Sequence, residues 1–375
     1  MTARGSVIRR AAIVLAIAAF AGTGWTSARL WFAWNDVARV AFEPGDARSA
    51  LEDPNNTDRT PTTIPYVEEA IDPLESTEPV AGGEVAVSPD EYAAASRAGA
   101  DETMDVYLVL GSDERESLGS SRRADTIMVL MIPTDGSTPV LVSIPRDLYL
   151  RNPCSGRMTR INANLNGCGS YATGPEQVAI AVEDFAGVKI DHFVVFTFTG
   201  FRRIVDRVGG VEICTDSAVR DLGVDPIPLN LPAGCSRVSG DQALAWVRSR
   251  HTKGFIDGRW VDLGSNDLVR NQRQQDILLQ AMGKVTEMHD ISELAALAAE
   301  LASEFAIDDG ITLASAVATA WELRRLDIAG IARPVLPVAD YVDPDGRWVL
   351  VPRATFESIV VAANPLLAPY FSPAD

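Results

Sequence analysis

Beyond residue 104 the chain carries three short apolar runs, and each has the composition of a β-strand. They cover residues 106–110, 126–132 and 139–144. The Pro-Thr-Asp-Gly sequence at 133–136, between the second and third runs, is typical of a turn. The pattern predicts three strands of one meander, in which each strand runs antiparallel to the one before it.

Helical and strand patterns alternate through the rest of the chain. Thr199 and Asn266 are the predicted N-caps of two helices, and residues 239–242 have the sequence of a capping box. Strands interleaved with helices predict a layered α/β domain. The predicted helices are 175–185, 200–208, 242–250, 267–285, 291–305, 313–326 and a short one near Phe356; the further strands are 190–198, 211–214 and 349–351.

The N-terminus has the pattern of a membrane anchor. Three arginines among the first ten residues precede an apolar run at 11–25, which continues with small residues towards Trp34. A run of about 18–20 such residues spans a bilayer as a helix, and the positive flank stays in the cytoplasm. We expect a cytoplasmic tail at 1–10 and a single transmembrane anchor at 11–30. A cleaved signal peptide is the alternative, because Thr26-Ser27-Ala28 resembles a cleavage site.

The segment between this anchor and the first strand is expected to be a flexible linker. Residues 35–104 are rich in Pro, Thr, Asp, Glu and Ala, so burial cannot offset the entropy lost on ordering. We therefore expect an acidic linker over 31–104, outside the cytoplasm, with a short ordered piece near 37–42.

The charge balance excludes one class of partner. The 375 residues contain 33 Lys and Arg against 51 Asp and Glu, a net charge of −18. Nucleic-acid binding requires a basic surface, so we expect no nucleic-acid partner. Sixteen acidic residues and four arginines lie between Asp36 and Glu102, so the rest of the chain is nearly balanced. It carries most of the arginines, whose guanidinium groups bind phosphates with two parallel hydrogen bonds.

The four cysteines agree with an exported domain. An even number in such a protein predicts two disulfides, and four cysteines allow three pairings. We favour the local pairings Cys154–Cys168 and Cys214–Cys235, which close short loops. A zinc site is not favoured, because no pair has Cys-x-x-Cys spacing and the chain has 3 histidines.

The meander predicts where charged residues meet. Asp113 follows the first strand, Asp125 begins the second and Arg146 follows the third. Because neighbouring strands are antiparallel, all three should lie at one edge of the sheet, with Arg115 and Arg123 nearby. Paired carboxylates beside arginines suit a Mg²⁺-assisted phosphate site. Singly, each residue is more typical of a turn or a solvated strand end, and only their meeting at one edge indicates a site.

A second group of charged residues follows downstream. Arg248 and Arg250 end a predicted helix, where cations also complement the helix dipole. In the next helix Asp267, Arg270 and Gln274 share one face, with Arg273 beside them. Such a stripe is often only solvated. The core is expected to be contacted from the opposite side, by Val269, Leu278 and Leu279.

These motifs together resemble the LytR-CpsA-Psr family, in order from about residue 105 to 285. The residues that carry the resemblance are Gly-Ser-Asp113-Glu-Arg115, Arg123-Ala-Asp125-Thr-Ile-Met, Ser143-Ile-Pro-Arg146-Asp147, Arg160-Ile-Asn-Ala, Asp191-His-Phe, Gly209-Gly-Val, Ala243-Leu-Ala-Trp-Val-Arg248-Ser-Arg250-His and Arg270-Asn-Gln-Arg273-Gln274-Gln. The resemblance implies a catalytic domain over 105–370, which we expect to be a three-layer αβα domain with a mixed central sheet.

The resemblance also implies an activity. Members of the family are single-pass, extracytoplasmic phosphotransferases that move a glycopolymer from a polyprenyl-pyrophosphate carrier to the 6-hydroxyl of N-acetylmuramic acid in peptidoglycan. Mg²⁺ (or Mn²⁺) would be held by Asp113 and Asp125, and Arg146 would join them in catalysis. Arg160 stands where the family often has lysine. The expected substrate-binding residues are Arg115, Arg123, Arg160, Arg248, Arg250, Asp267, Arg270, Arg273 and Gln274.

Three alternatives stay open. The same site could hydrolyse the lipid pyrophosphate, or the chain could be a non-catalytic wall-binding protein or a transcriptional regulator. Residues 252–266 are longer than in many members and could alter the glycan-binding rim. Apolar side chains could also line a tunnel for the lipid; the candidates are Val178, Ile180, Phe185, Phe193, Val195, Phe196 and Phe198.

Overall fold

The computed structural model describes residues 31, 34–35, 37–52, 104–113, 123–264, 266–288, 297, 304–312 and 328–371. The chain divides into two compact units, and each is described by itself. The meander unit comprises Ala41–Val195 and Ile331–Asp375; the second unit comprises Met1–Val40 and Phe196–Gly330. Arg115, the predicted anchor and residues 53–103 of the predicted linker lie outside the described residues.

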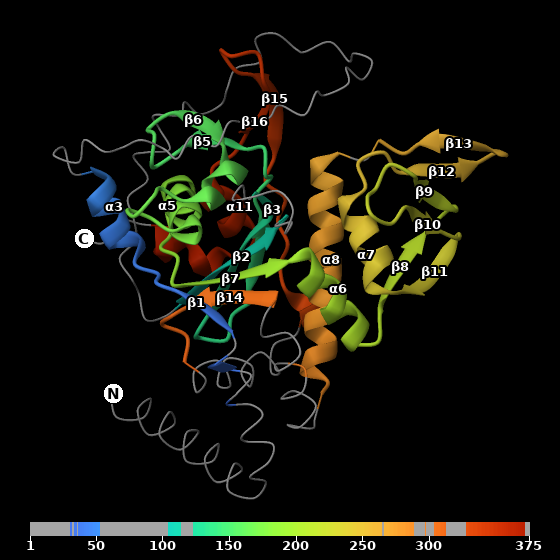
Figure 1. The fold of residues 1–375 in the computed structure, drawn as a ribbon, viewed down its shortest axis with the longest axis horizontal. Coiled ribbons are helices and arrows are strands. Elements are labelled where there is room, and N and C mark those ends of the chain that lie inside the picture. The colour runs from blue at the N-terminus through green and yellow to red at the C-terminus, as the bar shows by residue number, and fades with distance from the viewer. Residues whose placement is uncertain are drawn as a thin grey trace, which may run out of the picture. The chain divides into compact units, whose positions relative to one another are not determined.

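The predicted meander forms the sheet of the meander unit. Strands β2 (Met104–Ser112), β3 (Ala124–Pro133) and β4 (Val140–Ser143) pair antiparallel in sequence order. Strand β7 (His192–Thr197) lies beside β2, which gives the order β7-β2-β3-β4 (Figure 1). Ala332 forms a parallel bridge with Val140 on the far side of β4. The sheet is therefore mixed, as expected, and the α/β class is confirmed.

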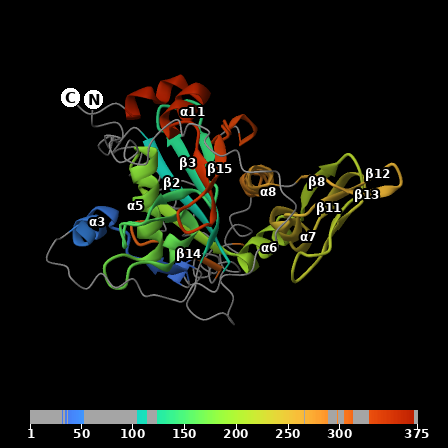
Figure 2. The same ribbon diagram turned by 90° about the horizontal axis from the view of Figure 1, so that it is seen from above.

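Helix α5 (Gly174–Ala186) packs on this unit's core and is buried on most of its surface. Thr173 and Glu176 form a capping box at its start, and Gly187 ends it with a left-handed φ of 72°. These signals explain why the predicted helix 175–185 is found almost residue for residue. Helix α11 (Phe356–Ala363) packs against both α5 and β4 (Figure 2).

Part of the predicted linker is ordered. Strand β1 (Ala38–Val40) confirms the short ordered piece expected near 37–42, and helix α3 (Pro44–Glu52) lies within the linker beyond it. Helix α3 is fixed to α5 because Arg48 forms ion pairs with Glu183 at 3.1 Å and with Asp184 at 2.5 Å. A polar sequence gives no apolar periodicity for such a helix, so only these tertiary contacts reveal it. Among the described residues no helix is both long and apolar enough to cross a membrane.

Short elements complete the meander unit around the ends of β3 and β4. They bring the chain that follows Arg146 back against the C-terminal hairpin, through a parallel bridge between Leu148 and Leu350. The elements are β5 (Tyr149–Arg151), β6 (Met158–Arg160), η1 (Ile161–Asn166), β15 (Val338–Val342), β16 (Trp348–Pro352) and η4 (Pro365–Phe371).

The second unit encloses its own apolar core, which includes Val205, Val211 and Ile213. Helix α7 contacts both α6 and α8 (Figure 1). Two small antiparallel sheets occur here, β8-β11 and β10-β9-β12-β13, and β1 pairs with β14 in parallel. The elements are α6 (Phe198–Arg207), β8 (Val211–Thr215), β9 (Val219–Asp221), β10 (Leu229–Leu231), β11 (Gly234–Val238), α7 (Gly240–Arg248), β12 (Lys253–Ile256), β13 (Arg259–Asp262), α8 (Asp267–Thr286), β14 (Phe305–Asp308) and η3 (Ile328–Gly330).

Several details of the second unit differ from the sequence expectations. The N-cap of α6 is Thr197 rather than Thr199, because the Thr197 side chain accepts the Gly200 N–H. Ser239 precedes α7 but makes no side-chain capping hydrogen bond, so the expected capping box is absent. Phe305 begins β14 instead of ending a helix. Residues 313–326 lie outside the described part.

The longer segment at 252–266 forms a hairpin. Strands β12 and β13 pair antiparallel across a turn at Asp257 and Gly258, whose φ angles are 50° and 76°. Two consecutive positive φ angles are typical of the tight turns whose twist matches paired strands. The greater length of this segment was visible in the sequence, whereas its hairpin structure was not predicted.

Both local disulfides are present. Cys154 bonds to Cys168 in the meander unit, and Cys214 bonds to Cys235 across the β8-β11 pair in the second unit. Among the described residues one cluster, Glu212 with the last two cysteines, has metal-ligand spacing. Its sulfurs are oxidised to a disulfide and are not available as thiolate ligands.

Candidate active site

Asp113 and Asp125 lie at the same edge of the sheet in the meander unit. The pairing of β2 with β3 shifts between Gly111↔Thr126 and Ser112↔Ala124, so Asp125 is the extra residue of a β-bulge. Bulges re-aim side chains and are frequent beside active sites. The Asp113 carboxylate accepts the Arg123 backbone N–H at 2.9 Å, which fixes it against the start of β3. The shared edge that the meander predicted is confirmed.

Arg146 joins this edge from the third strand. Its Nη1 lies 2.6 Å from Asp125 Oδ1, and the two side chains are only 16% and 14% exposed. The strand end is held because the Ile144 N–H donates to the Ile127 carbonyl at 2.8 Å. A charge-assisted contact with so little solvent around it holds both groups in one geometry. The predicted meeting of Asp125 with Arg146 is therefore present.

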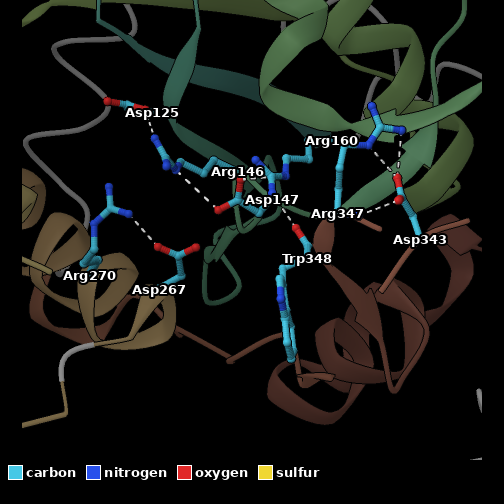
Figure 3. Close-up of polar contacts among 9 residues, drawn as sticks. All are labelled: Asp125, Arg146, Asp147, Arg160, Asp267, Arg270, Asp343, Arg347 and Trp348. Atoms are coloured by element: carbon cyan, nitrogen blue, oxygen red, sulfur yellow. Dashed lines mark hydrogen bonds and ion pairs between the residues drawn. The ribbon is translucent and has the colours of Figure 1, made fainter. Parts of the chain in front are cut away.

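Asp147 adds a carboxylate between two arginines. Its Oδ2 lies 3.5 Å from Arg146 Nε, and its Oδ1 lies 3.5 Å from Arg160 Nε (Figure 3). Negative and positive groups thus alternate in the order Asp125, Arg146, Asp147, Arg160. Asp147 belongs to the Ser143-Ile-Pro-Arg146-Asp147 motif, for which no role of Asp147 was predicted. Its position directly after Arg146, at a strand end, was the available signal.

Arg160 is also tied to the C-terminal hairpin. Its Nη2 donates to the Trp348 carbonyl at 2.5 Å. The Leu350 N–H donates to the Asp147 carbonyl at 3.0 Å, so β16 contacts the same segment twice. The row of charges is therefore held from both sides, by β3 and by β16.

In the second unit, Arg270 is the most deeply buried of the predicted arginines on α8. Its Nη1 contacts Asp267 Oδ1 at 2.5 Å, and its side chain is 5% exposed (Figure 3). Its Nε is buried and donates no hydrogen bond to any described residue. A buried cationic donor of this kind is suited to an anion.

The remaining polar face of α8 is buried rather than solvated. Gln274 and Arg273 are buried, and the apolar residues that face the core are Ile277 and Ala281. The expected core residues Val269, Leu278 and Leu279 are only half-buried. The prediction of the core-facing side of α8 was therefore wrong, because hydrogen bonds and ion pairs satisfy its polar side chains inside the protein.

Arg273 supports the end of α7. Its guanidinium lies 3.7 Å from the centre of the Trp246 ring, and its Nη1 donates to Thr252 Oγ1 at 3.0 Å. The same nitrogen donates to the carbonyl of Ser249. Burial, followed by the nearby charge of Arg270, lowers the pKa of Arg273 to about 10, so it stays charged at neutral pH. These contacts favour a supporting role over direct substrate binding.

Asp221 is a residue of this region that the sequence analysis missed. Its carboxylate accepts the Ser249 hydroxyl at 2.7 Å and the His251 backbone N–H at 3.1 Å. Burial acts to raise the pKa of Asp221, but these hydrogen bonds and one from Gly223 outweigh it and hold the pKa below its ordinary value. The carboxylate is thus a fixed anchor for the turn between Arg248 and His251.

Arg248 and Arg250, on either side of Ser249, differ in their surroundings. Arg248 donates to the Asp225 carbonyl at 2.5 Å, and its guanidinium lies 4.6 Å from the centre of the Phe198 ring. Arg250 is exposed. The turn therefore carries one braced and one solvent-facing guanidinium group.

The proposed lipid tunnel receives little support from the packing. Phe193 contacts Phe42 at 4.9 Å between ring centres, and Phe185 contacts Phe356 at 6.0 Å. Four of the seven candidate side chains are buried in the core: Val178, Ile180, Phe185 and Phe193. Val195, Phe196 and Phe198 are half-buried and are the remaining candidates.

The donor set at the sheet edge fits a hard divalent cation. Asp113 and Asp125 offer only carboxylate oxygens, the ligands that Mg²⁺ and Mn²⁺ prefer. An ionised carboxylate has about four acceptor positions, so the contacts of Asp113 with Arg123 and of Asp125 with Arg146 do not by themselves exclude a metal ion. The residues present are therefore compatible with a metal ion.

Comparison with known proteins decides the family. The model of the LytR_cpsA_psr family matches residues 74–358. This chain belongs to that family. The resemblance expected from the ordered motifs is confirmed.

The chain is similar to proteins of known name. Corynebacterium glutamicum cell wall biosynthesis protein LcpA is 31% identical over 297 residues, covering 66% of this chain and 52% of LcpA. Bacillus subtilis polyisoprenyl-teichoic acid–peptidoglycan teichoic acid transferase TagU is 30% identical over 187 residues, covering 50% of this chain and 54% of TagU. The chain thus spans about half the length of these curated relatives.

A solved structure supports the fold. The LytR-Csp2A-Psr enzyme from Actinomyces oris is 26% identical, with a TM-score of 0.55, and the match covers 71% of this chain and 89% of that chain.

Proposed function

We propose that this chain is a phosphotransferase that moves a glycopolymer from a polyprenyl-pyrophosphate carrier to the 6-hydroxyl of N-acetylmuramic acid in peptidoglycan. The observation that carries the proposal is the Asp125–Arg146 ion pair beside Asp113, at one edge of the sheet. Such a site supplies acceptors for a hydroxyl proton and fixed cations for phosphate oxygens. TagU, named as a polyisoprenyl-teichoic acid–peptidoglycan teichoic acid transferase, is an enzyme of the same class.

In the proposed reaction the sugar hydroxyl oxygen attacks the glycan-bearing phosphorus. The bond from that phosphorus to the bridging oxygen breaks, and polyprenyl phosphate leaves with the bonding electrons. One of the two aspartates accepts the hydroxyl proton. The products are a glycan–phosphodiester–muramic acid linkage and polyprenyl phosphate, so atoms and charge balance.

The arginines of the meander unit would supply positioned positive charge. Arg146 and Arg160 are held on either side of Asp147, so their guanidinium groups need little reorganisation when a phosphate approaches. Asp147 prevents the two cations from repelling each other. We propose that both donate to pyrophosphate oxygens, with Arg123 beside Asp113 as a further donor.

In the second unit, we propose phosphate-binding roles for Arg248, Arg250 and Arg270. The buried Nε of Arg270 is the strongest of these candidates. Arg273 and Asp221 would support the turn that carries Arg248 and Arg250.

We also propose that Asp113 and Asp125 hold Mg²⁺ or Mn²⁺, which when bound would neutralise charge on the pyrophosphate. Titration calorimetry tests this apart from activity. Mg²⁺ should bind the wild-type chain, and binding should be lost in Asp113→Asn and Asp125→Asn.

We further propose the topology expected from the sequence: a membrane anchor at 11–30, a catalytic domain outside the cytoplasm and helices on both faces of the central sheet. The two disulfides support an oxidising compartment. Protease added to intact cells should digest the domain if this topology is right, and protection of the domain would exclude it.

The test of the activity supplies purified full-length protein with a radiolabelled, polyprenyl-pyrophosphate-linked glycan and peptidoglycan. Label should enter peptidoglycan in a phosphodiester that resists phosphatase. Release of a glycan phosphomonoester at the same rate with and without peptidoglycan would instead identify a hydrolase. No turnover in either arm would favour a non-catalytic wall-binding or regulatory role.

A further inference from the structure

The hairpin of β15 and β16 presents one face to solvent. It adjoins the alternating charges of Asp125, Arg146, Asp147 and Arg160. Val342 pairs with Trp348 and Asp340 pairs with Leu350, and residues two apart in a strand point to the same face. These four side chains therefore share a face, which we call the hairpin platform. The other face carries Tyr341, whose ring centre lies 6.2 Å from that of Tyr149.

The platform is unusual for its exposure. Trp348 is 45% exposed and Val342 is 38% exposed, and Asp340 is exposed beside them. Among the described residues of the meander unit, five large apolar side chains are exposed: Val335, Tyr341, Val342, Trp348 and Leu366. Two of the five, Val342 and Trp348, lie side by side on the platform, and Tyr341 lies on the opposite face of the same hairpin. Such clustering marks an interaction site more often than scattered exposure does.

The hairpin is rigid at its tip. The Asp343 side chain is fully buried and accepts the backbone N–H groups of Arg347 at 2.8 Å and Asp345 at 2.9 Å. Arg347 Nη2 lies 2.7 Å from the carboxylate of Asp343 and 2.7 Å from that of Asp345 (Figure 3 shows its contact with Asp343). The tip is thus closed on itself directly before Trp348, whose backbone carbonyl is bonded by Arg160.

The platform is also joined to the proposed phosphate site. The Trp348 carbonyl accepts from Arg160, while Figure 3 shows the indole extending away from Asp147 and Arg160. One short chain of contacts leads from Asp125 through Arg146, Asp147 and Arg160 to Trp348. A ligand on the indole would therefore lie beyond Arg160, at the opposite end of this chain of contacts from Asp125.

We propose that the hairpin platform binds the acceptor, a peptidoglycan glycan strand, by stacking a sugar ring on Trp348. Sugar rings carry an apolar, slightly positive C–H face that packs on the negative face of an indole. Asp340 on the same face supplies an acceptor for sugar hydroxyl or amide N–H groups. An open surface suits a long polymer that arrives from solvent, whereas the arginines are occupied by the donor pyrophosphate. The inference rests on the proposed function.

The binding test uses the full chain in detergent micelles and a soluble tetrasaccharide of alternating N-acetylglucosamine and N-acetylmuramic acid. Titration calorimetry should give a Kd about tenfold weaker for Trp348→Ala than for wild type, because a stacked anchor is lost. Trp348→Phe keeps an aromatic face and should restore most of the affinity. Val335→Ala, which removes an exposed side chain elsewhere in this unit, is the matched control and should bind normally.

The kinetic arm separates acceptor from donor. Trp348→Ala should raise KM for peptidoglycan and leave KM for the lipid-linked donor unchanged. The proposed role of the platform is wrong if Trp348→Ala raises only the KM for the lipid-linked donor. It is also wrong if wild type does not bind the tetrasaccharide, or if wild type and Trp348→Ala bind it equally well. If wild type binds the tetrasaccharide normally but transfers no glycan, the proposed function is wrong, whereas the proposal that the platform binds glycan strands still holds.

Discussion

Asp125 and Arg146 show how a single residue acquires a role from its neighbours. Asp125 is the extra residue of the bulge in β3, and Arg146 follows the end of β4. Their side chains meet at 2.6 Å, with little solvent to screen them. Removal of either leaves the other without this partner at this edge of the sheet.

Asp125→Ala and Arg146→Ala should each lower the rate of transfer at least about 100-fold, because fixed charge at the reacting phosphate is lost. Circular dichroism should show that both variants fold. Asp135→Ala, in the exposed turn after β3, is the matched control and should transfer normally. If either site variant still ligates glycan at the wild-type rate, the catalytic role proposed for that residue is wrong.

Arg273 illustrates a predicted substrate residue whose contacts lie within the protein. Arg273→Met should lower the free energy of unfolding by about 2–4 kcal/mol, because a buried cation–π contact and charged hydrogen bonds are lost. The exposed Arg250→Met should change it by less than about 0.5 kcal/mol. Urea unfolding measures both, and equal stability of the two variants would argue against the supporting role.

At the element scale, the packing of α3 on α5 depends on charged groups. Arg48 bonds to Glu183, and Glu183 also accepts the Ile190 N–H at 3.0 Å. Apolar periodicity predicted α5 well, but it missed α3 and placed the wrong face of α8 in the core. Both failures have one cause: periodicity treats polar side chains as solvated, and here they are buried with partners.

The α3–α5 contact has a consequence for pH. Burial raises the pKa of Glu183 above its ordinary value of 4.5, although hydrogen bonds from Ile190 and Arg48 oppose the shift. The folded protein then holds this proton more tightly than the unfolded chain does. The resulting stability is fully present below pH 4.5 and is lost as the pH rises through the raised pKa.

Glu183→Gln should therefore flatten the fall in the free energy of unfolding between pH 4.5 and neutral pH. The slope should persist in part, because burial also raises the pKa of Asp191. Urea unfolding at several pH values measures the slope. Identical slopes for wild type and the variant would contradict the assignment.

At the scale of the whole molecule, each unit carries one disulfide. Closing loops of this length restricts the unfolded chain, so each bridge should contribute about 2–4 kcal/mol. A reducing agent should lower the Tm, and Cys214→Ser with Cys235→Ser should reproduce part of that loss. Peptide mapping of the unreduced protein should find the two local pairs; any other pairing contradicts this fold.

The sequence alone determined the meander, the bounds of α5, the family and the meeting of Asp113, Asp125 and Arg146 at one edge, and it favoured the local disulfides among three possible pairings. These follow from local patterns, because strand order and antiparallel pairing fix which strand ends coincide. Only the tertiary structure decided that Asp147 lies between two arginines, that α3 belongs to the meander unit and that Arg273 and Asp221 brace the turn after α7. Those contacts join residues far apart in the chain, and no local periodicity encodes which buried polar group finds which partner.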